Sequence, residues 1–148
     1  MTHEDYMNQA LTLAREAAAH GEVPVGCVIV RDGKIIGRGR NRREEKQAVS
    51  SHAEMEAMAQ ANEALGSWRL EDCDLYVTLE PCPMCAGAII NARVRRVFYG
   101  ARDRAMGACG GVLTLFMEDF PHHPQLGGGI LAEDCQTVLS AFFKELRK

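Results

Sequence analysis

Residues 75–85 read Leu75-Tyr76-Val77-Thr78-Leu79-Glu80-Pro81-Cys82-Pro83-Met84-Cys85. The first part, residues 75–79, is rich in β-branched and aromatic side chains and predicts a short strand. Pro81 ends that strand, and Pro83 suits the first turn of a helix, where its missing N–H would have no partner. The small and apolar residues 84–92 then predict a buried helix. Both thiols of the segment, Cys82 and Cys85, are therefore expected at or near the N-terminus of this helix.

On either side of this segment, strands and helices alternate along the chain. Apolar residues spaced by three and four predict helices over residues 5–20, 52–64 and 133–147. Asp32-Gly33 is a strong hairpin signal between predicted strands at 23–30 and 34–39, and a further strand is expected at 94–99. Ser50 or Ser51 is expected to cap the helix that starts at residue 52, and Gly66 to end it. Between these elements we expect a charged surface loop at 41–47, a loop at 101–111, a short helix at 112–120, irregular chain at 121–129 and a short strand at 130–131.

This order of elements predicts one layered α/β domain over residues 1–148, with helices on both faces of a sheet. A chain of 148 residues can bury a full core, and 47% hydrophobic with 25% charged residues is an ordinary soluble composition. No apolar run approaches the roughly 20 residues that span a bilayer, so no membrane partner is expected. The acidic N-terminal residues do not resemble a signal peptide, which favours a cytoplasmic location.

The six cysteines favour a metal site over disulfides. In a reducing compartment three disulfides are not expected, and Cys82-x-x-Cys85 has the spacing of a metal-binding pair. The other four have apolar or small neighbours and are expected in the core, since a free cysteine behaves as a small hydrophobic residue; they are Cys27, Cys73, Cys109 and Cys135.

The net charge of −3 argues against a broad, non-specific grip on nucleic acid, which needs a basic face. The sequence nevertheless contains two local clusters of basic residues. Seven basic residues lie between Arg31 and Lys46, and a second group lies between Arg93 and Arg96. Each cluster is compatible either with a solvated surface or with a local contact to RNA.

Together, His52, Cys82 and Cys85 supply the three protein ligands of a catalytic zinc ion, which leaves a fourth position for water. The amide hydrogens and dipole at a helix N-terminus favour the thiolate form that binds metal. Zinc lowers the pKa of its bound water to roughly 7, so that hydroxide is available at neutral pH. A structural zinc site or a redox pair is the alternative for Cys-x-x-Cys alone. A structural site usually has four protein ligands, and only His122-His123 is left to complete one.

Glu54 is expected to act as the proton carrier. Residues two apart on a helical first turn do not share a face, so Glu54 should reach water and substrate without binding the metal. Such a carboxylate can take a proton from water, pass it to a ring nitrogen, and then protonate a leaving amine. His-x-Glu followed by Pro-Cys-x-x-Cys is the signature of zinc-dependent nucleobase deaminases, so the catalytic role predicted for Glu54 is hydrolytic deamination.

Longer segments carry a resemblance to a known family. They are residues 21–26 (Gly-Glu-Val-Pro-Val-Gly), 52–55 (His-Ala-Glu-Met), 75–88, 100–103 (Gly-Ala-Arg-Asp), 107–110 (Gly-Ala-Cys-Gly) and 139–143 (Leu-Ser-Ala-Phe-Phe). On these segments the chain resembles the bacterial tRNA-specific adenosine deaminases, a branch of the cytidine deaminase-like superfamily, over nearly its whole length.

The resemblance implies a three-layer α/β/α fold with a five-stranded mixed sheet, one Zn²⁺ per subunit and a homodimer. It also implies that the substrate is the wobble adenosine of a tRNA anticodon loop, which is converted to inosine. Asn41 and Asp103 are implied to hold the flipped nucleoside, and Val25, Gly26 and Ala53 to line the base pocket.

Three places depart from the family pattern on the side expected to face substrate. Ala48-Val49 stands where an Asp-Pro pair is usual, Pro121-His122 where Asn-His is usual, and Ala105 near a usual lysine. A related deaminase of a free base or nucleotide, of guanine or cytosine type, is therefore the alternative function. A non-enzymatic zinc protein or partner subunit is a third, although such a protein has no use for Glu54.

Overall fold

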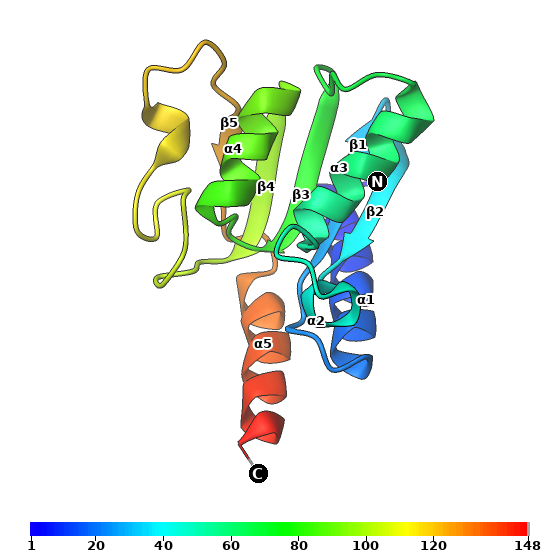
Figure 1. The fold of residues 1–148 in the computed structure, drawn as a ribbon. Helices are drawn as coiled ribbons and strands as arrows, with labels where there is room; N and C mark the ends of the chain where they lie inside the picture. The colour runs from blue at the N-terminus through cyan, green and yellow to red at the C-terminus, as the bar shows by residue number, and fades with distance from the viewer. Residues whose placement is uncertain (148) are drawn as a thin grey trace.

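A five-stranded mixed sheet lies between two layers of helices in the computed structural model, which describes residues 1–147 (Figure 1). The strand order is β2-β1-β3-β4-β5. The elements in chain order are α1 (His3–Ala19), β1 (Gly26–Arg31), β2 (Lys34–Arg40), α2 (Arg43–Lys46), α3 (Ala53–Leu65), β3 (Cys73–Leu79), α4 (Pro83–Ala92), β4 (Arg96–Ala101), η1 (Leu115–Met117), β5 (Gln125–Gly127) and α5 (Ala132–Leu146). The expected three-layer α/β/α architecture is confirmed.

Strand β3 lies at the centre of the sheet and leads directly to Cys82. It pairs antiparallel with β1 and parallel with β4. Because β3 and β4 are parallel, their carboxyl ends meet at the same edge of the sheet, where Leu79 lies opposite Ala101. The segment that follows β3 and the loop that follows β4 are therefore neighbours.

The hairpin between β1 and β2 forms at the predicted turn. Asp32 and Gly33 have φ values of 50° and 75°, and a type I′ turn needs positive φ at both central residues. Strand β2 then runs back along β1 as an antiparallel edge strand of the sheet.

Helices α3 and α4 cover one face of the sheet, and α1 and α5 cover the other (Figure 1). Helix α3 lies very close to β2, because a Cβ atom on Gly37 would stand 2.3 Å from the carbonyl oxygen of Ala57. At Gly39 a Cβ atom would stand 2.2 Å from the carbonyl oxygen of Ala53. Only glycine permits this approach, which holds the start of α3 against the sheet.

The four cysteines outside the predicted metal pair are all buried, as expected: Cys27, Cys73, Cys109 and Cys135. Within residues 1–147 every cysteine is a free thiol. In this part of the chain, every helix is also too short or too polar to cross a membrane.

The basic cluster at residues 93–96 is largely engaged within the chain. Arg95 and Arg96 both donate hydrogen bonds to Asp74, whose side chain is buried. Burial opposes ionisation of Asp74, but these two guanidinium groups outweigh it and hold the pKa of the carboxyl below its ordinary value. Arg93 lies 6.0 Å from the ring centre of Trp68. This cluster therefore mainly stabilises the fold.

Several sequence expectations were wrong in detail. The supposed loop at 41–47 contains the short helix α2, and the supposedly irregular chain at 121–129 contains β5. Strand β5 has only three residues and no apolar run, so only its pairing with β4 identifies it. The segment 130–131 leads into α5 instead of forming a strand, and a single 3₁₀ turn replaces the helix expected at 112–120.

The N-cap of α3 is His52, not Ser50 or Ser51, and its side chain makes no capping hydrogen bond. Gly66 ends the helix in the left-handed conformation, as expected. The cap position turns His52 out of the helical surface, towards the neighbouring segment after β3.

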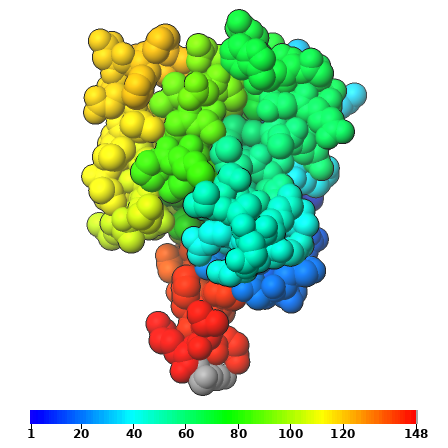
Figure 2. All heavy atoms as spheres, viewed as in Figure 1, coloured from blue at the N-terminus to red at the C-terminus, as the bar shows by residue number. Residues whose placement is uncertain are grey.

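Helix α5 packs by its first half only. Cys135 and Leu139 are buried, whereas Phe143 and Leu146 are exposed. Figure 2 shows this helix projecting from the body of the molecule. Its apolar stripe therefore continues beyond the core that the first half completes.

Candidate active site

The three predicted metal ligands all lie at helix N-termini. His52 is the N-cap of α3, Cys82 is the N-cap of α4, and Cys85 lies in the first turn of α4 after Pro83. Pro83 occupies the predicted position in the first turn. The two helices start from the same edge of the sheet, so their positive dipole ends converge on one point.

The distances among these ligands match the geometry of a tetrahedral zinc site. The Nδ1 atom of His52 lies 3.6 Å from the sulfur of Cys82 and 3.5 Å from the sulfur of Cys85. Zinc–sulfur and zinc–nitrogen bonds of about 2.3 and 2.0 Å at a tetrahedral angle place such atoms about 3.5 Å apart. The ligand atoms lie within 4.8 Å of one another, and no other group of three or more His, Cys, Asp or Glu residues with metal-site spacing occurs in residues 1–147.

The two thiols differ in how readily they ionise. A hydrogen bond from Cys85 lowers the pKa of Cys82 to about 4, against the effect of burial, and His52 contributes in the same direction. The pKa of Cys85 is raised because its proton is held by Cys82 and because it is buried. Cys82 is therefore the first of the pair to become a thiolate, the form that binds metal.

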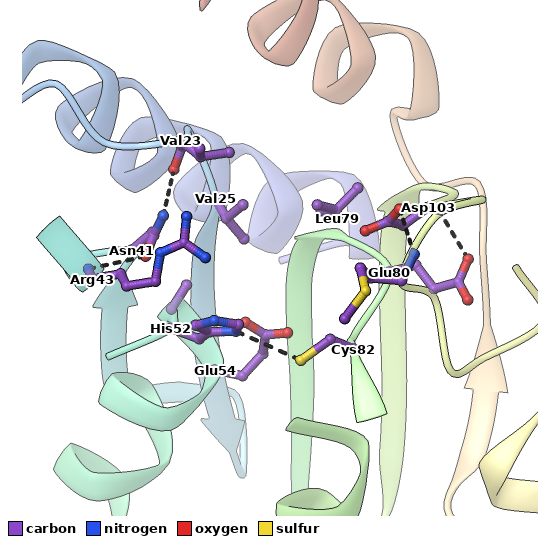
Figure 3. A pocket seen from close by; sticks show the side chains of 12 residues that line it. Val23, Val25, Asn41, Arg43, His52, Glu54, Leu79, Glu80, Cys82 and Asp103 are labelled. Carbon is purple, nitrogen blue, oxygen red and sulfur yellow. Dashed lines mark hydrogen bonds between the residues drawn. The ribbon is translucent and has the colours of Figure 1, made fainter. Parts of the chain in front are cut away.

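Glu54 lies beside the ligands without belonging to them (Figure 3). Its side chain is only 4% exposed. Burial raises the pKa of this carboxyl to about 7, and the negative charge of Cys82 adds to the effect. A carboxyl group with a pKa near neutrality can both accept and donate a proton at physiological pH.

A pocket of about 200 Å³ opens over His52 and Glu54. Four of the residues predicted to contact substrate line it, namely Val25, Asn41, Ala53 and Asp103. Their roles in binding stay predictions. Gly26, the fifth, does not line this pocket, because it packs against α1, where a Cβ atom would stand 1.9 Å from the carbonyl oxygen of Ala10.

On one side of the pocket, Asn41 is held by both ends of its amide. The side-chain nitrogen donates to the carbonyl oxygen of Val23 at 3.2 Å, and the side-chain oxygen accepts from the backbone of Arg43 at 3.2 Å. Asn41 also pairs with Val25 through its backbone N–H. It therefore shapes this wall of the pocket by fixing the turn that precedes α2.

On the opposite side, Asp103 belongs to the loop that follows β4. Its side-chain oxygen accepts hydrogen bonds from the backbone of Ala105 at 3.0 Å and of Met106 at 3.1 Å. These bonds fold the loop into a tight turn that brings Met106 to the pocket.

Five further residues line the pocket without having been predicted to do so: Val23, Arg43, Leu79, Glu80 and Met106. Val23, Leu79 and Glu80 stand inside the motifs that carry the family resemblance, so their position was a usable signal. Arg43 stood within a basic run, where nothing in the sequence separated it from its neighbours. The three departures from the family pattern lie in different surroundings. Val49 is exposed, Ala105 donates its backbone N–H to Asp103, and His122 donates a hydrogen bond to the carbonyl oxygen of Val94 at 2.7 Å.

The sequence profile of the MafB19-like deaminases matches residues 1–147. The chain is also 49% identical to a tRNA-specific adenosine deaminase of Bacillus subtilis, over 100% of this chain and 93% of that protein. The chain belongs to the tRNA-specific adenosine deaminase family. A tRNA-specific adenosine deaminase of Streptococcus pyogenes is 43% identical over 97% of this chain and 91% of that protein. As a member of this family, the protein is a hydrolytic deaminase.

Solved structures of related deaminases share the fold. A tRNA:A34 deaminase that edits the wobble position superposes with a TM-score of 0.88 at 44% identity, over 91% of this chain and 99% of that chain. A guanine deaminase of Bacillus subtilis gives a TM-score of 0.66 at 45% identity, over 69% of this chain and 66% of that chain. The expected cytidine deaminase-like fold of this tRNA-specific adenosine deaminase family member is confirmed.

Proposed function

We propose that this chain converts the wobble adenosine of a tRNA anticodon loop to inosine, with loss of ammonia. The observation that carries the proposal is the extent of the match to the tRNA:A34 deaminase, which includes nearly all of both chains. The match to the guanine deaminase is equally close in identity but covers a smaller part of both proteins. A tRNA substrate also agrees with the cytoplasmic location expected from the sequence.

The donor set of His52, Cys82 and Cys85 suits one zinc ion per subunit. Two sulfur ligands and one imidazole nitrogen are ligand types that zinc prefers, and three protein ligands are typical of catalytic sites. When bound, zinc supplies a water molecule that is activated for attack at neutral pH. His52 and Cys82 line the pocket together with Glu54, which supports a zinc site at this pocket.

Glu54 carries the protons of the reaction. Its carboxylate accepts a proton from the attacking water and delivers it to the N1 atom of the adenine ring. It then takes the second proton of the former water from the hydroxyl group now on C6 and passes it to the amino group, so that the C6–N bond breaks, the C6 carbonyl forms and ammonia leaves. Both transfers need a group that changes protonation state easily, and a pKa of about 7 gives Glu54 that property.

The pocket suits a single base extruded from RNA. Its volume of about 200 Å³ is below the 300–1,000 Å³ typical of sites that enclose a whole drug-sized ligand, so the sugar and phosphates would remain outside. Extrusion is less costly from an open anticodon loop than from a duplex. Asn41 and Asp103 stand on opposite walls and supply polar atoms, while Val25 and Ala53 supply apolar surface.

Arg43 is placed to contact the RNA backbone. Its side chain is exposed at the edge of the pocket, and within residues 1–147 it makes no ion pair. Its neighbour Arg42 is instead held by Glu45. A guanidinium group in this position suits a phosphate beside the extruded base.

An anticodon stem-loop should be deaminated and free bases should not. In this experiment the purified protein is incubated with a stem-loop that carries adenosine at the wobble position. Separate samples contain free adenine, guanine and cytosine. Inosine in the stem-loop is the expected product, measured by nuclease digestion and chromatography. Ammonia released from guanine or cytosine alone would instead establish the alternative function.

The homodimer remains part of the proposal. Half of α4 faces solvent beside the 112–120 segment, which exposes four apolar side chains: Val112, Leu113, Met117 and Phe120. Large apolar side chains gathered on a surface are typical of protein contacts. Sedimentation equilibrium should therefore give the mass of two chains at micromolar concentration, and a mass of 16.3 kDa would reject the dimer.

A further inference from the structure

We infer that Glu80 is a positioning residue, which holds the loop at residues 102–111 so that Asp103 and Met106 face the base. The inference deepens the proposed function and rests on it, because it concerns the geometry of the same pocket. Glu80 lies in the segment between β3 and Cys82, and it is outside the metal-binding group.

The carboxylate of Glu80 accepts three hydrogen bonds from the backbone of this loop. One oxygen, Oε1, accepts from the N–H of Asp103 at 3.1 Å. The other, Oε2, accepts from the N–H groups of Cys109 and Gly111, each at 2.8 Å. Backbone N–H groups from both ends of the loop therefore point at one side chain, and Figure 3 shows Glu80 next to Asp103.

Glu80 is 2% exposed, so these bonds are shielded from water. The loop closes tightly around it. A Cβ atom on Gly107 would stand 2.1 Å from Oε2, and one on Gly111 would stand 2.0 Å from the carbonyl oxygen of Asp103. Side chains other than hydrogen do not fit at these two positions, and the loop has little room to move while Glu80 is in place.

The loop at residues 102–111 depends on the hydrogen bonds to Glu80, because it has little regular secondary structure of its own. Cys109 and Thr114 form an isolated bridge, and the rest of residues 102–114 is turns and coil. Its contacts with the apolar core come from Ala108 and Cys109. The carboxylate of Glu80 therefore replaces the hydrogen bonds that a helix or strand would supply.

The other wall of the pocket is held in the same manner by another buried carboxylate. Glu22 is 1% exposed and accepts hydrogen bonds from the N–H groups of Glu44 and Glu45, at 3.1 and 2.7 Å. Those bonds fix α2, next to Asn41. Glu22 thus gives a matched control, because it is equally buried and has the same chemistry but acts on a different wall.

Replacement of Glu80 by glutamine tests the role without changing size. The glutamine amide has one acceptor oxygen, and its NH₂ group would face N–H groups that need an acceptor. At least one of the three loop bonds is then lost, and the loop is free to shift. Because a displacement of about 1 Å can cost roughly 10²-fold in rate, Glu80→Gln should lower kcat/KM for the stem-loop by about 10- to 100-fold.

A double-mutant cycle with Asp103→Ala distinguishes positioning from general destabilisation. If Glu80 acts through Asp103, then Glu80→Gln should cost less than about 3-fold once Asp103 is alanine, because coupled residues are not additive. The two single variants should also divide their losses between KM and kcat in the same way. For the control Glu22→Gln, the fold-losses in kcat/KM should multiply with those of Asp103→Ala. The zinc content of every variant should stay at the wild-type level.

Fully multiplicative losses for Glu80→Gln and Asp103→Ala would overturn the inference. So would a loss of zinc as the sole cause of the Glu80→Gln defect. Should Glu80→Gln fail to fold, Gly111→Ala displaces the same loop while Glu80 is intact. Its loss of kcat/KM must then also shrink to less than about 3-fold once Asp103 is alanine. Wild-type protein that does not deaminate the stem-loop would reject the proposed function instead, which keeps the two failures distinct.

Discussion

The Glu54→Ala variant is expected to fold and bind zinc normally while its turnover of the stem-loop falls by about 10²- to 10⁴-fold. Its carboxyl group lies beside the metal-binding group but does not belong to it, so the ligands remain complete. The variant therefore lacks only the carboxyl group that moves the protons, whose pKa burial raises to about 7.

Two further variants make this result specific to the proton transfer. Glu54→Gln has the same size and can still form hydrogen bonds, but it cannot carry the proton, so it should be nearly as inactive as alanine. Glu56→Gln, on the same helix, should keep activity within about 3-fold, because Glu56 is partly buried outside the pocket, where it pairs with Lys46. The measurements are stem-loop turnover, zinc by mass spectrometry and circular dichroism. Undiminished turnover of Glu54→Ala would refute the mechanism.

Loss of a thiol ligand should remove both metal and activity. Loss of a partner that merely orients a zinc ligand typically costs 10- to 100-fold in affinity, so loss of Cys82 itself should cost more than about 100-fold. Cys82→Ala is therefore expected to purify with little zinc and without measurable deamination. Dialysis of the wild-type protein against a chelator should have the same effect, and added Zn²⁺ should restore it.

Cys135→Ala is the matched control for the metal. Cys135 is as buried as Cys85 but lies between α5 and the sheet, on the opposite face from the ligands. Its replacement should leave zinc content and activity unchanged and lower only thermal stability. If Cys82→Ala retained stoichiometric zinc, the proposed ligand set would be wrong.

The framework of the fold was accessible from sequence because its signals are local. The Asp32-Gly33 turn, the glycine after α3 and Pro83 at the start of α4 each act through the backbone conformation of one or two residues. Strand β5 and helix α2 were not predicted, because each is stabilised by residues that are distant in the sequence. The three residues of β5 form a strand because they pair with β4, and the four residues of α2 form a helix in which Glu22 accepts the N–H groups of Glu44 and Glu45.

The metal ligands could also be predicted from the sequence, whereas the residues that form the walls of the pocket could be predicted only in part. His52, Cys82, Cys85 and Glu54 could be named because metal ligands need particular residue types at short spacings, and the structure brings them together. Glu80 stood in the most informative segment of the chain, yet nothing in that segment indicated that its carboxylate would bind a loop more than twenty residues away.

By itself, then, the sequence of residues 75–85 determined a strand that turns into a helix, with two thiols at the turn and the reaction they imply. The tertiary structure decided what surrounds that turn. It brought the start of α3 to the same sheet edge as the start of α4, so that His52 meets the thiols, and it placed the loop after β4 around Glu80. The physical reason is that bonding rules fix metal chemistry residue by residue, while a pocket is formed by packing between segments distant in the chain.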